Sequence, residues 1–313
     1  MSHQVAVIQK PPILLDREAT IADALLSIRE AVGKGASLLV FPEALIPGYP
    51  TWVWRLKPGG DMALSGALHA RLLDNAVDLQ RDHLEPLTSA AAEHQVTIVC
   101  GINEIDSAFS GSTLFNTVVT IGPDGSILNR HRKLMPTNPE RMVWGNGDAS
   151  GLRVVDTPVG RIGTLLCWEC YMPLARYALY AQAMDLFIAP TWDTGESWIA
   201  SMRHIAKEGG CWVISTATAM QGGDIPETFP DRERLFSQEE WINDGDAVVV
   251  KPMGGIVAGP LHRQKDILYA QIDRTLAHKA RRSLDVTGHY SRPDIFSFSV
   301  DRRPRVPVTF ADE

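Results

Sequence analysis

The chain has 313 residues, of which 45% are hydrophobic and 21% charged, a composition typical of globular proteins. Its formal net charge is −7 and it has no long Lys/Arg block, which argues against a nucleic-acid partner because phosphate binding needs a basic face. No apolar stretch approaches the roughly 20 residues that a membrane-spanning helix needs, so no membrane partner is expected.

The first half of the chain alternates short β-rich runs with helical patterns. The run at Ser37–Phe41, SLLVF, is continuously apolar, which is typical of a strand buried on both faces. In order, we expect a strand at Gln4–Gln9, a helix with Ile21, Leu25, Ile28 and Val32 on one face, the strand Ser37–Phe41, a mostly helical region from Met62 to Gln95, a strand at Val96–Cys100, and a hairpin at Asn116–Arg130.

The second half continues the alternation. In order, we expect a hairpin at Arg153–Leu166, a helix at Tyr171–Met184, a strand at Asp185–Ala189, a helix at Ser197–Lys207, a strand at Cys211–Thr216, a hairpin at Asp246–Pro260, a strand at Ile267–Ile272 and a helix at Thr275–Ser283. The segment Gly222–Asn243 carries Pro, Gly and many charges, so we expect a flexible insertion, although Trp241 argues against complete disorder.

These elements predict one α/β domain with a mixed sheet system, because the sequence has no internal repeat, low-complexity tract or linker. Two domains that divide near residue 150 are the alternative. The N-terminus, MSHQVAVIQK, lacks the basic-then-apolar pattern of a secretory leader. Four cysteines in a chain of this length do not form a disulfide scaffold, so we expect a cytoplasmic protein with free thiols.

Cys167 and Cys170 form a CxxC pair, Cys-Trp-Glu-Cys, which can belong to a zinc site or a redox disulfide. A zinc site needs four ligands, but Cys100 and Cys211 stand alone and no His lies within ten residues of Cys170. A thioredoxin-like disulfide would leave most of this long chain unexplained. Taken alone, the pair is best interpreted as two buried thiols that pack as small apolar side chains.

The position of Cys167 favours a further interpretation. The strand Arg161–Leu166 precedes it and the helix Met172–Met184 follows, with Pro173 near the first turn, where proline is tolerated. Cys167 would therefore occupy a sharp strand-to-helix turn. Unpaired backbone N–H groups and the helix dipole would lower its pKa there and could bind a developing anion. Cys170, three residues later, would point elsewhere, so Cys167 is the candidate nucleophile.

A thiol nucleophile needs a base and a charge stabiliser. Glu43 ends the apolar strand SLLVF, where a carboxylate is costly without a partner or a function, although it could also cap a backbone N–H. Lys133 ends the second strand of a hairpin and could equally be a solvated edge charge. These side chains and Cys167 would converge if their strands run in the same direction, which the residues alone do not establish.

Three motifs carry a resemblance to a known family. They are FPEALIPGYP around Glu43, HRKLMPTNPERMVWGNGD around Lys133 and LLCWECYMPLARYALYAQ around Cys167, supported by DLFIAPTW, HIAKEGGCWV and GHYSRPDIFSFSVD. Together they cover nearly the whole chain. The sequence resembles the nitrilase superfamily of carbon-nitrogen hydrolases and, within it, the true nitrilases.

The resemblance implies a four-layer αββα sandwich that forms a single domain over residues 1–313. It also implies a Glu-Lys-Cys triad of Glu43, Lys133 and Cys167, with Glu140 matching a second glutamate of this branch that supports catalysis. Cys170 departs from the pattern, because true nitrilases most often carry Asn or His there, which puts detailed subgroup specificity in doubt. The family further implies a homodimer or a larger spiral homo-oligomer, for which the Met62–Leu87 region is the candidate contact.

The triad chemistry predicts that the chain hydrolyses a small-molecule nitrile to the carboxylic acid and ammonia through thioimidate and thioester intermediates. Glu43 would act as base and then acid, and Lys133 with the Trp168 N–H would stabilise the anion. This reaction requires no metal and no organic cofactor. An amidase or carbamoylase with the same triad is the alternative, although MPTNPERMVWGNGD favours a nitrilase. A CxxC redox or zinc-binding protein is the more distant alternative.

Aromatic residues in or near the motifs are candidate substrate-binding residues, although each could equally serve in core packing. They are Tyr49, Trp54, Trp144, Trp168 and Trp192. An apolar pocket for an aromatic or arylaliphatic nitrile would need several of them.

Overall fold

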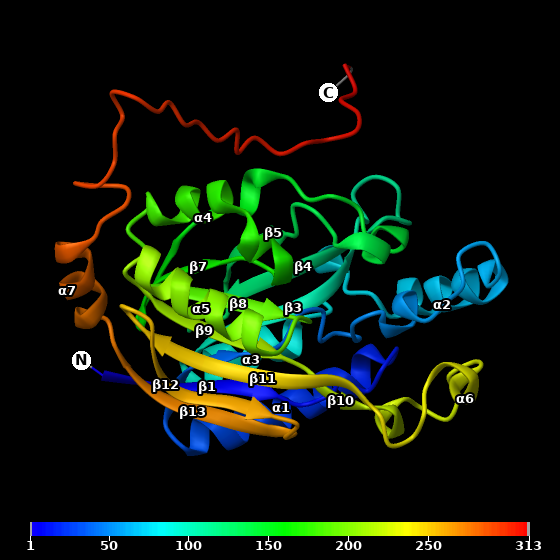
Figure 1. Cartoon of the computed structure of the whole chain (residues 1–313). Coiled ribbons are helices and arrows are strands. Elements are labelled where there is room, and N and C mark those ends of the chain that lie inside the picture. Colours follow the sequence, from blue (N-terminus) through cyan, green and yellow to red (C-terminus); the bar gives the residue numbers. More distant parts are fainter. Residues whose placement is uncertain (1, 312–313) are drawn as a thin grey trace.

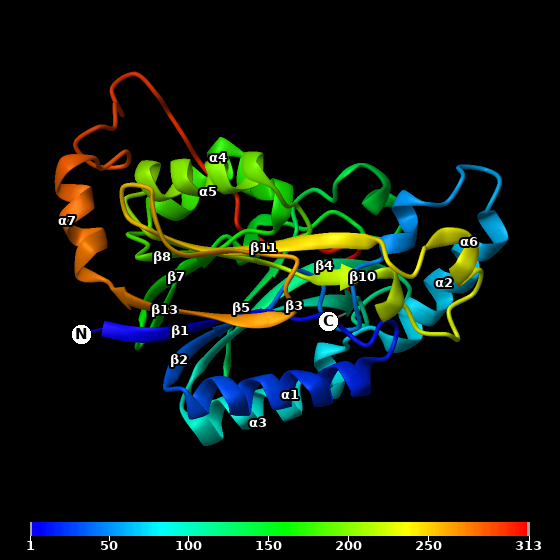
Figure 2. The same cartoon turned by 60° about the horizontal axis from the view of Figure 1, so that its bottom comes forward.

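The computed structural model describes residues 2–311 and contains two β-sheets that pack face to face, with helices on both outer faces (Figures 1 and 2). The core between the sheets is built from Val and Ile side chains of both, such as Val7, Val40, Ile162 and Ile188. This arrangement confirms the expected αββα sandwich.

The first sheet has the strand order β13-β1-β2-β3-β4-β5. Its strands are β1 (Ser2–Gln9), β2 (Ala36–Val40), β3 (Thr97–Ile105), β4 (Leu114–Ile121), β5 (Ile127–Arg132) and β13 (Asp266–Asp273). The β1–β2 and β2–β3 pairs are parallel, and the others are antiparallel. Two antiparallel steps separate β5 from β3, so β2, β3 and β5 all run in the same direction.

The second sheet follows the order β10-β11-β9-β8-β7-β6, with β12 paired to β11. Its strands are β6 (Val155–Thr157), β7 (Gly160–Thr164), β8 (Leu186–Thr191), β9 (Trp212–Ala217), β10 (Ala219–Gln221), β11 (Trp241–Lys251) and β12 (Gly255–His262). Strands β7, β8 and β9 are parallel, as expected for strands joined by helical crossovers. The chain crosses from the first sheet to the second between β5 and β6.

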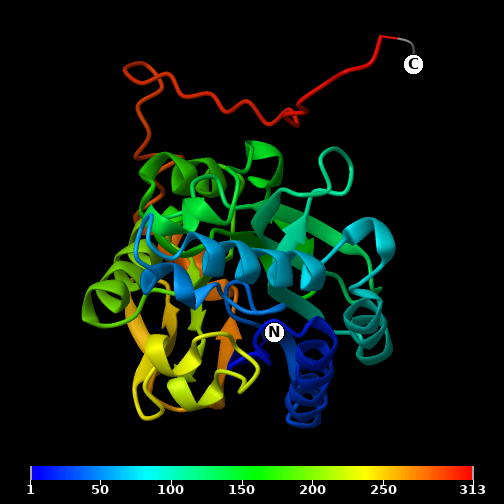
Figure 3. The same cartoon turned by 90° about the vertical axis from the view of Figure 1, so that its right-hand side faces the viewer.

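Helices cover both outer faces. They are α1 (Arg17–Gly33) and α3 (Glu85–His94) on the first sheet, α4 (Pro173–Tyr180) and α5 (Glu196–Glu208) on the second, and α2 (Met62–Asn75), α6 (Arg232–Leu235) and α7 (Thr275–Ser283) beyond them. The α1 helix begins where the Asp16 carboxylate accepts the N–H of Ala19, and α4 begins at proline. Figure 3 faces the end of the sandwich where α2 and α6 lie.

Two sequence expectations differ from the structure. The segment Gly222–Asn243 is folded rather than a flexible insertion, because Phe229, Leu235 and Phe236 are buried and pack in one cluster with Trp52. The expected helix Tyr171–Met184 is shorter, since α4 begins at Pro173 and the CxxC pair lies in a separate 3₁₀ turn. The first error arises from long-range packing, which local composition does not report. The second concerns the helix ends, because α4 spans only Pro173–Tyr180.

The chain beyond α7 runs extended along the outside of α4 (Figures 1 and 3). Phe298 packs edge-on against Tyr177 of α4 with ring centroids 5.5 Å apart, and the Arg305 N–H donates to Asp148 at 2.8 Å. Over residues 2–311, no helix combines the length and the apolar character that crossing a membrane requires.

Candidate active site

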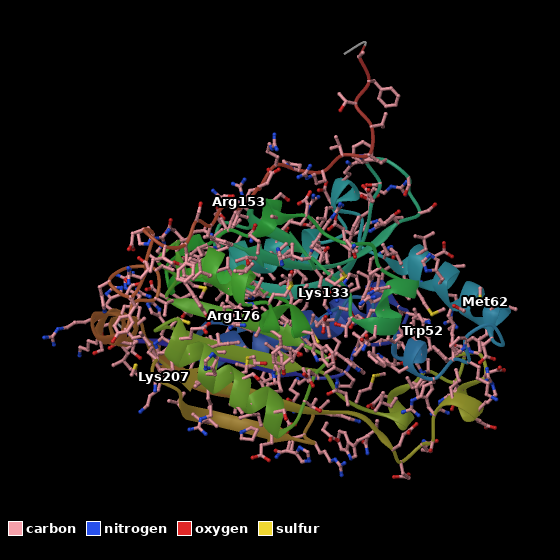
Figure 4. All side chains as sticks on the ribbon, turned by 45° about the horizontal axis from the view of Figure 1, so that its top comes forward. Trp52, Met62, Lys133, Arg153, Arg176 and Lys207 are labelled. Carbon is pink, nitrogen blue, oxygen red and sulfur yellow. The ribbon has the colours of Figure 1, made fainter. Side chains whose placement is uncertain are left out.

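Four strands of the two sheets end at the same place, and the candidate residues lie within three residues of the strand ends. Glu43 follows β2, Lys133 follows β5, Cys167 follows β7 and Trp192 follows β8. The carboxyl ends of parallel strands are where α/β folds place their ligands. The convergence that the sequence left open is therefore present, and Figure 4 shows Lys133 inside the molecule near its centre.

Close backbone packing holds the Glu43 loop against the neighbouring strand. A Cβ atom on Gly101 of β3 would lie 2.3 Å from the Pro42 carbonyl oxygen and 2.8 Å from the Glu43 Cα. Only glycine allows this approach. On the other side of β3, the Lys133 N–H donates to the Asn116 carbonyl at 2.8 Å, which extends the β4–β5 pairing to the lysine itself.

Cys167 occupies a strained position. Its φ is +53°, in the left-handed region that non-glycine residues rarely adopt. It is the first residue of a 3₁₀ turn, Cys167–Tyr171, and α4 begins only at Pro173. Strain of this kind persists only where surrounding structure enforces it, and it often marks functional sites.

The Lys133 ammonium bridges two carboxylates. Its Nζ lies 2.9 Å from Glu43 Oε1 and 2.8 Å from Glu140 Oε2, and all three side chains are buried. Burial alone would lower the pKa of Lys133, but the Glu43 and Glu140 charges raise it above its ordinary value, so the amine stays protonated. An ammonium has three donors. Two of them are engaged here, which leaves one for another acceptor.

The two oxygens of Glu43 differ in their partners. Oε1 accepts both from Lys133 Nζ and from Asn116 Nδ2, the latter at 2.7 Å. Oε2 is buried and has no hydrogen-bond partner within residues 2–311. Burial raises the pKa of this carboxyl above 4.5, with Lys133 opposing the shift. A raised pKa and a free oxygen suit a group that accepts and returns a proton near neutral pH.

The expected lowering of the Cys167 pKa is wrong. Burial, with a further contribution from the Glu43 carboxylate, raises the pKa of this thiol to about 12. Desolvation outweighs the attraction of Lys133, and a five-residue 3₁₀ turn does not have the dipole of the α-helix expected there. The thiol is therefore protonated at neutral pH and needs a base to become a nucleophile.

Glu140 is held more completely than Glu43. Its Oε1 accepts from the Tyr49 hydroxyl at 2.6 Å, and its Oε2 accepts from Lys133 and from the Thr137 N–H. Burial and the Glu140 charge raise the pKa of Tyr49, which keeps this hydroxyl a donor. With both oxygens engaged, Glu140 is suited to holding Lys133 and Tyr49 rather than to moving a proton.

Sequence reasoning missed a buried pair beneath the site. Glu169 accepts from His131 Nε2 at 2.9 Å, from the Leu134 N–H at 2.8 Å and from the Leu166 N–H at 2.9 Å. It thereby ties the residue after Lys133 to the residue before Cys167. Although burial alone would raise the pKa of Glu169, His131 and the backbone donors lower it. The only indication of this pair in the sequence was the spacing of His131 and Lys133, which are two residues apart and therefore share one face of the strand end.

A pocket of about 140 Å³ opens onto Cys167. It is lined by Tyr49, Trp54, Thr137, Glu140, Cys167, Trp168, Trp192 and Asp193. Four of the five aromatic residues expected from the sequence are in this lining, and Trp192 stacks on Tyr49 with ring centroids 4.2 Å apart. Trp144 lies behind Tyr49, where its Nε1 donates to Asn103. Thr137 and Asp193 were not anticipated.

The two CxxC cysteines have different environments. The Cys170 thiol is fully buried in an apolar cluster, and its sulfur lies 3.7 Å from the Leu165 carbonyl oxygen, whereas Cys167 lines the pocket. Both are free thiols. Within residues 2–311, no three or more His, Cys, Asp or Glu side chains group in a way that could hold a metal ion.

Comparison with known proteins agrees with this fold. Residues 4–282 match the carbon-nitrogen hydrolase family. An aliphatic nitrilase of Sinorhizobium fredii is 40% identical to this chain, over 97% of each chain. A bifunctional nitrilase/nitrile hydratase of Lupinus angustifolius is 37% identical, over 98% of this chain and 88% of its own. The crystal structure of a carbon-nitrogen hydrolase from Helicobacter pylori shares the fold, with a TM-score of 0.71 at 21% identity, over 94% of this chain and 97% of its own.

Proposed function

The chain belongs to the carbon-nitrogen hydrolase family, and we propose that it is a nitrilase that converts a nitrile and two waters to a carboxylic acid and ammonia. The observation that supports this chemistry most directly is the unpartnered, buried Glu43 Oε2 beside a protonated thiol. Nitrilase relatives at 40% and 37% identity favour this substrate class over the amides of the alternative enzymes. They also disfavour a CxxC redox or zinc protein.

The first step joins the nitrile to the enzyme. As Cys167 Sγ attacks the nitrile carbon, the thiol proton passes to Glu43 Oε2, and negative charge develops on the nitrogen. The free donor of Lys133 and the Trp168 N–H stabilise that charge. Trp168 lies at the start of the 3₁₀ turn, where backbone N–H groups lack intrahelical acceptors. The proton held by Glu43 then moves to the nitrogen, which gives a thioimidate.

Two water molecules complete the reaction. The first, deprotonated by Glu43, adds to the thioimidate carbon and forms a tetrahedral intermediate. Glu43 returns that proton to the nitrogen and then carries the hydroxyl proton of the intermediate to the same nitrogen. The C–N bond breaks, ammonia leaves and the C=O bond forms, so that an acyl thioester remains on Cys167. The second water, activated in the same way, releases the carboxylic acid and restores the thiol. Each proton taken by Glu43 is returned, as the raised pKa of this group allows.

Ammonia release from nitriles and from their matching amides tests the function. We expect release from at least one nitrile, with a higher kcat/KM than for the amide of the same side chain. Both substrate classes would use the same triad, so the ratio reports the preference of the pocket rather than the presence of the nucleophile. Release from amides alone would support the amidase or carbamoylase alternative instead.

We also propose a homodimer or a larger spiral homo-oligomer, with the Met62–Leu87 region as the candidate contact. Met62 at the start of α2 is 62% exposed, and large apolar side chains of the C-terminal segment are exposed as well, so both segments offer apolar surface that a second chain could bury. Light scattering at micromolar concentration should give a mass of at least two chains. A single species near 34.4 kDa would contradict the proposal.

The remaining proposals concern organisation and compartment. We propose that residues 1–313 form one domain, because both sheets contribute to the shared core between them. The site needs neither a metal nor an organic cofactor for the steps above. Four free cysteines, one of them the proposed nucleophile, favour a reducing compartment such as the cytoplasm.

A further inference from the structure

The carboxylate of Asp193 is fixed at the edge of the pocket. Its Oδ2 accepts from Trp168 Nε1 at 2.8 Å and from the Tyr171 hydroxyl at 3.2 Å, and its Oδ1 accepts from the Thr194 N–H at 2.9 Å. Trp168 and Tyr171 belong to the same 3₁₀ turn as Cys167. The carboxylate is thus held in place beside the nucleophile, and its two oxygens retain lone pairs for another donor.

The charges around the pocket do not balance. Three carboxylates, those of Glu43, Glu140 and Asp193, accompany the single ammonium of Lys133, which already donates to both glutamates. The pocket lining drawn from residues 2–311 contains no Lys, Arg or His side chain. Cys167 adds no charge while its thiol is protonated. The pocket therefore has an excess of negative charge and no cation free to pair with an anionic substrate.

The pocket is also small. Its volume of about 140 Å³ lies well below the roughly 300–1,000 Å³ of pockets that enclose drug-sized ligands. Stacked Tyr49 and Trp192 form part of its wall, and this arrangement leaves little room for rearrangement. A nitrile whose carbon meets Cys167 therefore occupies a pocket that Asp193 also lines.

We propose that this site takes small aliphatic nitriles that are uncharged or positively charged and discriminates against nitriles that carry a carboxylate, with Asp193 as the residue that sets this preference. The proposal rests on the nitrilase function proposed above and specifies its substrate class.

Electrostatics gives the expected size of the effect. A unit charge on the substrate about 7 Å from Asp193, at an effective dielectric constant of about 20 to 40, changes binding by roughly 7- to 50-fold, and salt reduces the effect. The same field acts on the product. Every turnover creates a carboxylate in a negatively charged pocket, so the charge that excludes anionic substrates also favours product release.

Three nitriles of similar size test the proposal. They are 4-aminobutyronitrile, whose ammonium is charged at neutral pH, uncharged valeronitrile, and the anion 3-cyanopropanoate. Ammonia release gives kcat/KM for each at low and at high ionic strength. For the wild-type protein we expect the ammonium nitrile to exceed the carboxylate nitrile by at least about tenfold, with a smaller ratio at high salt.

Variants assign the preference to one residue. Asp193→Asn removes the charge but keeps an acceptor for Trp168, and should shift the ammonium-to-carboxylate ratio at least about tenfold toward the anion. Asp193→Glu keeps the charge and should preserve the wild-type ratio even if turnover falls. The matched control is Asp156→Asn, which changes the net charge equally at an 85% exposed side chain outside the pocket and should leave the ratio unchanged.

The outcomes separate this proposal from the nitrilase function. Equal kcat/KM values for the three nitriles would overturn the charge preference and leave the nitrilase function intact. The same conclusion would follow if Asp193→Asn and Asp156→Asn changed the ammonium-to-carboxylate ratio equally. If none of these three nitriles released ammonia but another nitrile of the panel did, the substrate-class proposal alone would fail. Release from no nitrile at all would overturn both proposals. A ratio that shifts only in Asp193→Asn and returns in Asp193→Glu would establish the assignment.

Discussion

Cys167→Ala should abolish nitrile hydrolysis, with a loss in kcat of at least about 10⁴-fold, because no other group can form the covalent intermediate. The fold should remain, since removing one sulfur beside a pocket leaves only a small cavity that costs about 1 kcal/mol or less. Cys167→Ser should fail almost as badly, because a hydroxyl is a much poorer nucleophile toward a nitrile carbon. Thermal unfolding and ammonia release, measured on the same preparations, check both statements.

Cys170→Ser is the matched control for this prediction. Cys170 is buried in the apolar cluster beneath α4, and a serine hydroxyl there could donate to the Leu165 carbonyl that the sulfur now faces. We expect much of the activity to remain. Activity that survived in Cys167→Ala but disappeared in Cys170→Ser would reverse the roles of the two cysteines.

Glu43→Gln should lower kcat about 10²- to 10⁴-fold, the usual contribution of a general acid–base group. The amide keeps an oxygen for Lys133 and Asn116 but cannot accept the thiol proton. Glu140→Gln is the comparison, because Glu140 also pairs with Lys133 but has no free oxygen. It should lower turnover strongly, by about 10- to 100-fold, through misplacement of Lys133, while the Cys167 thiol still reacts with an alkylating probe.

The pH dependence distinguishes the two glutamates. Activity requires ionised Glu43, whose pKa is raised by burial and by the charge of Glu140, so the rate should fall with decreasing pH above the ordinary glutamate range near 4.5. In Glu140→Gln this acid limb should move to lower pH, because one cause of the raised pKa is gone. In Glu43→Gln the residual activity should lose the limb. An unchanged limb in Glu43→Gln would show that another group is the base.

The strand ends of the site could be predicted because each one follows a strong local signal. SLLVF before Glu43 is a continuous apolar segment, and the strand before Cys167 is followed by a helix pattern with Pro173 near its first turn. Buried strands of this kind end at the sheet edge where polar groups can gather. The convergence of the two sheets was not predictable from the residues, since it depends on strand order. It followed only from the resemblance of three long motifs to a family.

The groups that surround each side chain were harder to predict than the position of that side chain in the fold. The direction of the Cys167 pKa shift was wrong because it depends on burial by residues distant in sequence, not on the turn that carries the thiol. Asp193 and the His131–Glu169 pair were missed for the same reason: their partners come from other segments. Trp144 has the aromatic character expected of a pocket residue, but Tyr49 stands between it and the pocket.

Intact-protein mass spectrometry during turnover tests the central proposal most directly. Quenching the enzyme with acid while nitrile is in excess should trap a covalent adduct whose mass equals that of the thioimidate or the acyl thioester, and peptide mapping should place it on Cys167. Reducing agent should preserve the activity that forms this adduct. An adduct on Cys170, or a Cys167–Cys170 disulfide required in the active protein, would contradict the mechanism.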